Sequence, residues 1–286
     1  DVKRNIPYDY ICQAALDGYL PMIDFLKIQP DLFDLNEEKA LRYYSDLILQ
    51  GNFWFLCKSA SHFCLWKLKN RIKGLEFILL GAEHDDPESI AYLAHLHSPS
   101  CVFQEEQNLV KQDKEHAINL YKKAIELGKM SVLRDCAVLL LENKDKKEDY
   151  ELAMSYLRKA GEHGDVLAMM DLMDEYFYGE QENLEKALYW GNEIIKDSKS
   201  IAYNYAMSIV GTIYYIQDKQ DEAFTCLRTA HLGQTKSGIV PTLHSLFLLA
   251  ECYYYGIGTY KDYSLAYKYY KECIEQDNNI GTNKSI

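Results

Sequence analysis

Apolar residues recur along most of this chain at intervals of three and four, the spacing that gathers side chains on one face of a helix. Five predicted helices follow it: Leu93 to Leu96, Val132 through Cys136 to Leu139, Leu172 to Tyr176, Ile209 to Ile213, and Leu246 through Leu249 to Tyr253. Two of them have helix-start signals. Asp86-Pro87 offers an N-cap and a first-turn proline before residues 90–96, and Pro241 precedes the helix that runs to Tyr255. The pattern predicts an all-α chain.

A second set of helices begins with a small residue that is followed three or four positions later by an aromatic or apolar one. The clearest copy is Ala266 with Tyr269 and Tyr270, after a glycine turn. The other copies begin at Ala117, Ala153, Ala187 and Ala223, with weaker ones at Ala40 and Gly74. These small anchors lie 34 to 43 residues apart, an interval that fits a helix-turn-helix hairpin. Because one hairpin leaves an apolar face exposed, the copies must stack.

These patterns together resemble the Sel1-like repeat family, a branch of the tetratricopeptide-repeat (TPR) superfamily. The two best copies are Leu249-Ala250, Tyr253, Gly256-Ile257-Gly258, Asp262-Tyr263, Ala266 and Tyr269, and then Leu172, Tyr176, Gly179, Lys186-Ala187 and Trp190. A copy with Gly211 and Ala223 has a twelve-residue spacing and is more similar to an ordinary TPR. The resemblance covers residues 90–286 and extends over residues 1–75 in outline.

The resemblance implies a right-handed α-solenoid of about seven helix-turn-helix (Sel1-like/TPR-like) repeats. We expect residues 1–89 to form degenerate N-terminal helical repeats. Residues 90–280 are predicted as Sel1-like repeats continuous with them in one solenoid, and residues 281–286 as a flexible tail.

The net charge and the cysteines indicate which partners and which cellular compartment the protein has. The 286 residues carry a net charge of −12, which argues against a general nucleic-acid binder. No apolar run approaches the roughly 20 residues of a membrane-spanning helix. Eight cysteines without a recurring spacing favour free thiols in a reducing compartment, so we predict an intracellular, cytoplasmic protein. Because the chain begins with Asp1, we expect a processed form or a fragment, with room for a lost leader or anchor.

One local cluster carries metal-ligating side chains: His95 and His97, with Cys101 beyond them and His84 upstream. Side chains two positions apart on a helix point about 200° apart, so both histidines reach one ion only if the helix ends between them. Pro99 allows that ending. The commoner interpretation is a set of ordinary helix-end and loop histidines, and we predict no metal site.

The sequence does not match the common motifs for cofactor binding or catalysis. Gly128-Lys129 has Lys123 and Met130 where a phosphate-binding loop needs Gly and Ser or Thr. No Gly-x-Ser-x-Gly or His-Glu-x-x-His occurs in the sequence. We therefore predict that the protein is not an enzyme and uses no cofactor.

Tyrosine is unusually frequent, at 24 residues, and most of these rings are expected between repeats. In TPR-type hairpins the inner surface is lined by first-helix positions three before, one after and four after the small anchor. Here the resemblance gives Ala137, Met173, Gly211 and Ala250 as anchors. The transferred pattern selects a partner-binding groove of Arg134, Met170, Asp174, Phe177, Thr212, Tyr215, Phe247, Glu251 and Tyr254, and it also includes Val138, Leu141 and Ser208.

A basic patch is the second candidate surface: Lys58, Lys67, Lys69, Arg71 and Lys73, in a stretch from Leu47 to Leu75 without an acid. The simpler interpretation is a basic helix end that complements the helix dipole. The sharper one is contact with anionic lipid head groups or with an acidic partner.

The predicted function is a non-catalytic scaffold or adaptor, as the resemblance implies, that holds a protein or peptide segment in its concave groove and assembles it into a complex. Two alternatives stay open. One is a small-ligand or metal-binding helical-repeat receptor or enzyme. The other is a structural dimer on a membrane surface, with membrane contact only indirect.

Overall fold

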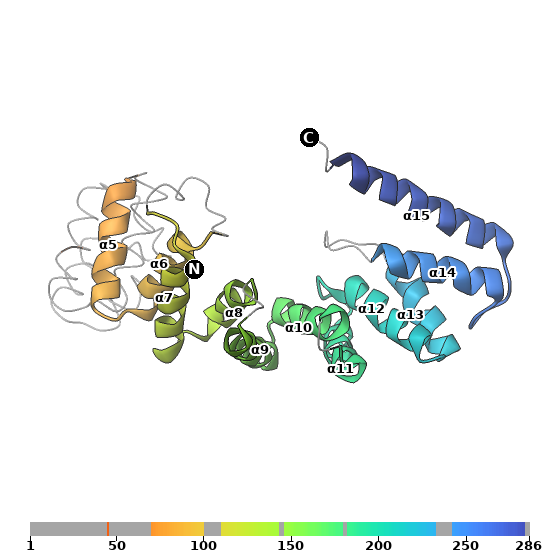
Figure 1. Ribbon diagram of the computed structural model, residues 1–286, viewed down its shortest axis with the longest axis horizontal. Helices are drawn as coiled ribbons and strands as arrows, with labels where there is room; N and C mark the ends of the chain where they lie inside the picture. Colours follow the sequence, from red (N-terminus) through yellow and green to blue (C-terminus); the bar gives the residue numbers. More distant parts are fainter. Residues whose placement is uncertain are drawn as a thin grey trace, which may run out of the picture. The chain divides into compact units, whose positions relative to one another are not determined.

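The computed structural model describes Ser45 and residues 70–99, 110–142, 146–179, 182–232 and 242–283, with side chains to residue 276 (Figure 1). All regular secondary structure in these ranges is helical, so the predicted all-α class is confirmed there. The chain divides into two compact units, Asp1–Tyr150 and Glu151–Ile286.

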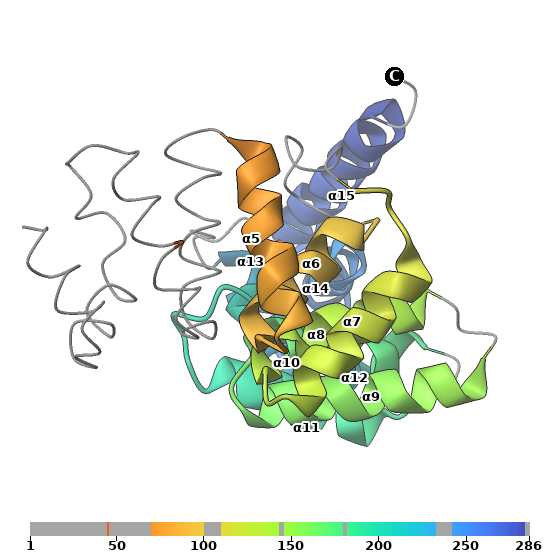
Figure 2. The ribbon, with the colours of Figure 1, turned by 90° about the vertical axis from the view of Figure 1, so that its left-hand side faces the viewer.

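In the unit Asp1–Tyr150, each helix packs on the next one along the chain. The helices are α5 (Arg71–Glu83), α6 (Pro87–His97), α7 (Lys114–Glu126), the 3-10 helix η3 (Met130–Val132) and α8 (Leu133–Leu141). α5 packs on α6, α6 on α7 and α7 on α8, and Figures 1 and 2 both show α5, α6 and α7 side by side. Fully buried side chains such as Ile78, Ile90 and Tyr121 fill the spaces between them.

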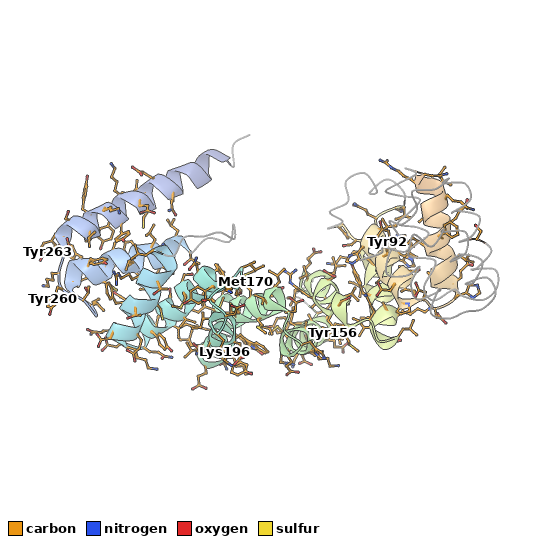
Figure 3. All side chains as sticks on the ribbon, turned by 180° about the vertical axis from the view of Figure 1, so that it is seen from behind. Tyr92, Tyr156, Met170, Lys196, Tyr260 and Tyr263 are labelled. Atoms are coloured by element: carbon orange, nitrogen blue, oxygen red, sulfur yellow. The ribbon has the colours of Figure 1, made fainter. Side chains whose placement is uncertain are left out.

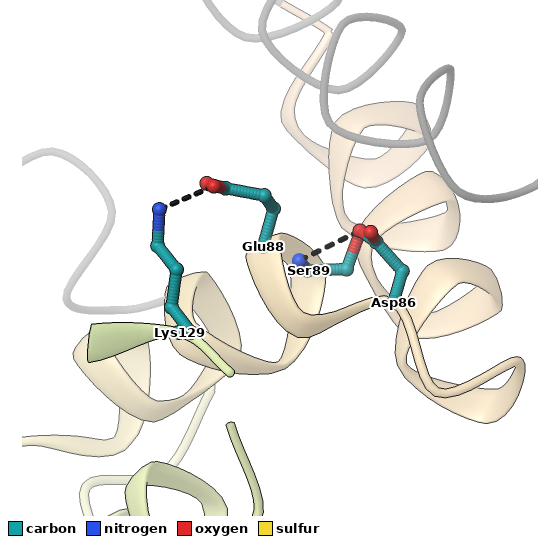
Figure 4. A network of polar contacts seen from close by, with 4 residues as sticks. All are labelled: Asp86, Glu88, Ser89 and Lys129. Atoms are coloured by element: carbon teal, nitrogen blue, oxygen red, sulfur yellow. Dashed lines mark hydrogen bonds and ion pairs between the residues drawn. The ribbon is translucent and has the colours of Figure 1, made fainter. Parts of the chain in front are cut away.

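The start of α6 confirms the predicted helix signal. Asp86 is the N-cap, and its Oδ2 accepts hydrogen bonds from the Ser89 backbone N at 2.8 Å and from the Ser89 hydroxyl at 2.5 Å (Figure 4). The carboxylate is only 1% exposed, and burial raises its pKa. In the same first turn of α6, Glu88 forms an ion pair with Lys129, which ties α6 to the segment before η3.

The division between the units falls within α9 (Lys147–Glu162). The unit Glu151–Ile286 continues with α10 (Val166–Tyr178), α11 (Leu184–Ile195), α12 (Tyr203–Ile216), α13 (Gln220–Leu232), α14 (Leu243–Tyr255) and α15 (Tyr263–Asn283). These helices form consecutive pairs, α10 with α11, α12 with α13 and α14 with α15, and α11 also packs on α12 and α13 on α14. α15 reaches Asn283, so the predicted tail is helical over residues 281–283.

The small anchors lie where the helices meet, as predicted. Ala117, Ala153, Ala187, Ala223 and Ala266 are all 0% exposed. The glycines at these contacts leave no room for a side chain. A Cβ built on Gly191 of α11 would lie 2.6 Å from Val210 Cγ2 of α12. Close approach of helices through small residues therefore builds the repeat, as the spacing of the anchors indicated.

Candidate functional site

α14 carries an exposed aromatic face. Phe247, Glu251 and Tyr254 lie at i, i+4 and i+7, which places them on one side of the helix. Phe247 is 43% exposed and Tyr254 is 44% exposed, whereas Leu246, Leu249 and Ala250 of the same helix are completely buried. The sequence pattern predicted Phe247, Glu251 and Tyr254 as groove residues.

Glu251 is half-buried among tyrosine rings. Its Oε1 accepts a hydrogen bond from the Tyr270 hydroxyl at 2.7 Å, and the Tyr270 ring lies 5.5 Å from the ring of Phe247. Burial raises the pKa values of Tyr215 and Tyr270, and the nearby Glu251 carboxylate raises both further. No basic side chain within the described ranges lies within ion-pair distance of Glu251. The α14 surface (Phe247, Glu251 and Tyr254, with Tyr215 and Tyr270) thus combines exposed rings with an unneutralised carboxylate.

α10 supplies a second group of predicted groove residues. Met170, Asp174 and Phe177 are all half-buried, and Figure 3 shows Met170 and Lys196 on opposite sides of this unit. Asp174 Oδ1 accepts a hydrogen bond from the Tyr205 hydroxyl of α12 at 2.9 Å. Burial raises the pKa of Asp174 to about 6, although the hydrogen bond from Tyr205 opposes this shift. Asp174 is therefore a carboxyl group whose charged form is poorly solvated.

Two of the predicted groove residues on α12, Thr212 and Ser208, are not accessible. Thr212 is 1% exposed, and its hydroxyl donates to the Ser208 carbonyl at 2.8 Å. Ser208 is also buried, and its Oγ accepts a 3.5 Å hydrogen bond from the backbone N of Thr242, just before α14. Thr212 is thus corrected from a binding residue to an interior one, because α14 and its N-cap Thr242 pack against this part of α12. Arg134 lies in the other unit, on α8, and is half-buried.

The histidines of the metal hypothesis have separate partners. His95 Nδ1 lies 2.7 Å from the Tyr121 hydroxyl, and its Nε2 lies 3.8 Å from Asp135 Oδ2. His97 instead donates from Nδ1 to the Lys111 carbonyl at 2.8 Å, and its ring lies 4.5 Å from that of His116. Cys101 lies outside the described residues. Within those residues no three potential ligands gather around one point.

The basic patch falls largely outside the described residues, which omit Lys58, Lys67 and Lys69. Arg71 and Lys73 lie in the first turn of α5, and Lys73 Nζ pairs with Glu76 at 2.6 Å. In the ranges that the structure describes, no helix is both long and apolar enough to cross a bilayer.

Sequence reasoning missed the tyrosines that hold the two carboxylates, Tyr205 and Tyr270. The frequent tyrosines were a signal that rings line the repeats. The sequence does not show which tyrosine hydroxyl donates to which carboxylate, because the paired residues lie on different helices, 31 and 19 positions apart in the chain.

Replacing Asp174 with Asn tests whether the charged form of the Asp174 carboxyl group destabilises the fold. Because the folded-state pKa of about 6 exceeds the unfolded value near 3.8, the folded protein binds this proton more tightly. Wild-type stability should therefore fall as pH rises from about 4 to 6 and stay lower above that range. Asp174→Asn keeps an acceptor for Tyr205, so we expect about 1–2 kcal/mol of extra stability at neutral pH and almost none near pH 4.

Urea unfolding at about pH 4.5 and 7.5 measures this difference. The exposed Asp221→Asn is the matched control and should change stability little at either pH. An Asp174→Asn gain that is equal at the two pH values would contradict the solvation argument.

Consecutive antiparallel helix pairs that meet through buried alanines and glycines define a helical-repeat protein of the solenoid class. The family model for the Sel1 repeat matches residues 87–129, 138–165, 167–192 and 243–278. These segments of the chain therefore carry Sel1 repeats, as the sequence pattern indicated. The matched segments leave out all of α12 and α13, the copy that is more similar to an ordinary TPR.

A curated relative is an uncharacterized Sel1-like repeat-containing protein of Schizosaccharomyces pombe, 24% identical over 307 aligned residues. The match includes 96% of this chain but only 41% of that relative's length. Two solved structures share the fold. A protective antigen of uropathogenic Escherichia coli strains, which displays an SLR fold, has a TM-score of 0.53 at 18% identity, with 86% of this chain and 60% of that chain covered. A Sel1 repeat protein from Oxalobacter formigenes has a TM-score of 0.53 at 20% identity, with 75% and 88% covered.

Proposed function

We propose that this chain is a non-catalytic interaction scaffold whose α14 surface binds a segment of another protein and thereby assembles it into a complex. Repeat proteins of this class commonly bind other proteins. One observation carries the proposal: exposed rings on α14 surround a carboxylate that no described cation neutralises. Such a surface offers apolar burial and one charged contact at the same place.

The chemistry of this surface indicates what it binds. Phe247 and Tyr254 are held on a regular helix, so their rings lose little conformational freedom when a ligand covers them. The Tyr270 hydroxyl fixes one oxygen of Glu251, which leaves Oε2 for a ligand. An apolar side chain between the rings, next to a Lys or Arg that contacts Glu251, satisfies both features. The charge preference follows from Glu251, while most of the affinity is expected from the rings.

The α10 group is the proposed second contact. Met170 and Phe177 offer apolar surface beside Asp174, and a cation at Asp174 would compensate for the poor solvation of its charge. Retention of a carboxylate at a position where burial disfavours it is typical of binding sites.

Truncation of both exposed rings tests the proposal. Phe247→Ala/Tyr254→Ala should weaken partner binding by about 1–3 kcal/mol per ring and leave the fold intact, because both side chains lie outside the core. Partners of the wild-type chain are identified by proximity labelling and purified, and their affinities for each variant are then measured by calorimetry.

The control is Tyr189→Ala on α11, which removes a somewhat more exposed ring, 56% accessible, from another helix. It should bind as the wild type does, and circular dichroism should show the same helicity for all variants. If the double variant kept every wild-type partner at unchanged affinity, binding on α14 would be wrong.

A further inference from the structure

Three aromatic rings lie beside the carboxyl group of Asp174. Phe177 and Tyr178 follow Asp174 by three and four positions on α10, so all three side chains share one side of that helix. The third ring is Tyr205 of α12, whose hydroxyl donates to Asp174 Oδ1 at 2.9 Å. The Phe177 and Tyr178 rings have centroids 4.6 Å apart and are nearly perpendicular. These four residues, from two consecutive repeats, form the Asp174 site.

The Asp174 site is open to solvent although further repeats pack after it. Tyr178 is 59% exposed, and Asp174, Phe177 and Tyr205 are half-buried. The hairpins α12–α13 and α14–α15 both follow α10 in the structure, as Figure 1 shows, and their packing leaves these side chains accessible. A ligand can therefore reach the carboxyl group and the rings at the same place.

No basic side chain in the described ranges forms an ion pair with Asp174. Burial, together with the negative charges of Asp171 and Glu175, raises the pKa of Asp174 to about 6, although the hydrogen bond from Tyr205 opposes this shift. Burial and the Asp174 carboxylate likewise raise the pKa of Tyr178, because the phenol of Tyr178 lies near that carboxylate. A bound cation would offset the repulsion among these groups.

The oxygen atoms and the rings of the site select the kind of cation. A guanidinium group pairs best with a carboxylate through two parallel hydrogen bonds, but the Tyr205 hydroxyl already occupies Asp174 Oδ1. An ammonium group is a compact charge that needs one oxygen, and Oδ2 meets that need. Methyl groups on the nitrogen pack against ring faces, as in aromatic cages for methylated lysine. With two methyl groups, one N–H still remains to donate to Oδ2.

We propose that the Asp174 site binds a lysine side chain of the partner, and binds it most tightly when the amine carries two methyl groups. This lysine is the residue received at the second contact of the proposed function, on which its assignment rests. Its N–H donates to Asp174 Oδ2, and its methyl groups contact the rings of Phe177 and Tyr178. Unmethylated lysine gains less from the rings because its ammonium group is strongly hydrated. Three methyl groups leave no N–H for the carboxylate.

Capped amino-acid amides measure this preference directly. The probes are the Nα-acetyl amides of lysine, dimethyllysine, trimethyllysine and arginine, with norleucine as the uncharged control. Met170 lies one turn before Asp174, so its isotope-labelled methyl group reports binding by NMR, and Met130 in the other unit is the control signal. Dimethyllysine should shift the Met170 signal with a dissociation constant on the order of millimolar, about threefold to tenfold tighter than the other cations. No shift up to about 50 mM dimethyllysine, or tighter binding of arginine, overturns the proposal.

Variants of the site separate the roles of the charge and of the rings. Asp174→Asn keeps an acceptor for Tyr205 but removes the charge, so it should weaken dimethyllysine binding about tenfold or more. Tyr178→Ala should remove most of the preference for the methylated amine, whereas Tyr178→Phe keeps the ring and should retain it. Tyr189→Ala and Asp221→Asn alter an exposed ring and an exposed acid on other helices and should bind as the wild type does. Wild-type affinity in Asp174→Asn overturns the proposal.

The affinity for dimethyllysine should fall in mild acid. Below its pKa of about 6 the Asp174 carboxyl group is protonated and neutral, so the site loses the charge that attracts the amine. Binding should therefore weaken about tenfold between pH 7.5 and 5, while the residual binding of Asp174→Asn should stay constant over that range. A wild-type affinity that is equal at the two pH values would assign the amine to a different group and overturn the proposal.

Amine binding at Asp174 and partner binding on α14 can fail separately. Phe247→Ala/Tyr254→Ala changes only the α14 surface, so it should bind dimethyllysine as the wild type does. If no amine shifted the Met170 signal while partner affinity still depended on Phe247 and Tyr254, the lysine site would be wrong and the α14 surface would stand. If the amines bound as expected and the double variant kept every partner, the α14 surface would be wrong instead. Circular dichroism of each variant confirms that its helices are formed.

Discussion

Gly211→Val is expected to lower the free energy of unfolding of the unit Glu151–Ile286 by about 3 kcal/mol or more. A Cβ at this position of α12 would lie 2.9 Å from both the backbone N and the Cγ of Leu227, and 3.0 Å from the Cβ of Cys226, on α13. The backbone atoms cannot rotate away, so α12 and α13 must separate. That separation opens a core in which Leu227 and Ile213 are completely buried.

Gly211→Ala adds a smaller side chain at the same position and should destabilise the unit less than Gly211→Val. Alanine gains about 1 kcal/mol over glycine in helix propensity, while overpacking costs about 1–3 kcal/mol, so a net loss of at most about 2 kcal/mol is expected. Urea unfolding measures both variants, with the exposed Thr225→Val of α13 as a control that should change stability by less than about 0.5 kcal/mol.

A second-site change tests the backbone contact. Because the clash includes the backbone of Leu227, shortening that side chain should fail to rescue Gly211→Val. Full recovery in Gly211→Val/Leu227→Ala would show that only a side chain was in the way.

Gly258→Ala is expected to destabilise the last hairpin by about 3 kcal/mol. Gly258 has φ of +62°, where an L-residue costs about 1–2 kcal/mol. Its added Cβ would also lie within 2.2 Å of the Gln220 carbonyl oxygen, at the start of α13. The turn between α14 and α15 must then move away from α13, and the contacts of Phe224 with Tyr253 should loosen.

Gly128→Ala is the matched control, because Gly128 also has a positive φ, +93°, but a Cβ there meets nothing within 4 Å. It should cost only the backbone preference, about 1 kcal/mol. Hydrogen exchange should show faster opening of α14 and α15 in Gly258→Ala alone. Equal losses of stability in the two variants would contradict the close contact with Gln220.

These variants connect packing with the proposed binding. Gly258 places the hairpin that carries Phe247, Glu251 and Tyr254 against α13. A shift of this hairpin should therefore weaken partner binding even though no α14 side chain is changed. Thr225→Val lies outside that contact and should leave binding unchanged.

The sequence predicted the local structure well where one helix contains the whole signal. Asp86 followed by Pro87 marks a helix start that needs only its own first turn, and the structure confirms it. The anchor alanines were also predictable, because each one starts the same short helix pattern and the copies recur every 34 to 43 residues. Phe247 and Tyr254 were found from their spacing around Ala250.

The inner-surface pattern failed at Thr212 and Ser208, which have the same spacing around Gly211 but are buried. Helix periodicity fixes which residues share a face, but it does not show what covers that face. The N-cap of α14, Thr242, packs on α12 here through its contact with Ser208, and no pattern within α12 signals this contact.

By itself the sequence determined the helical-repeat class, the anchors and the helix faces, because these depend on periods of three to four and of 34 to 43 residues that can be read along the chain. Only the tertiary structure decided that Tyr205 and Tyr270 hold the two carboxylates and that Thr212 is interior. The physical reason is that exposure and hydrogen-bond partners depend on which hairpins meet in three dimensions, and those contacts join residues far apart in the chain.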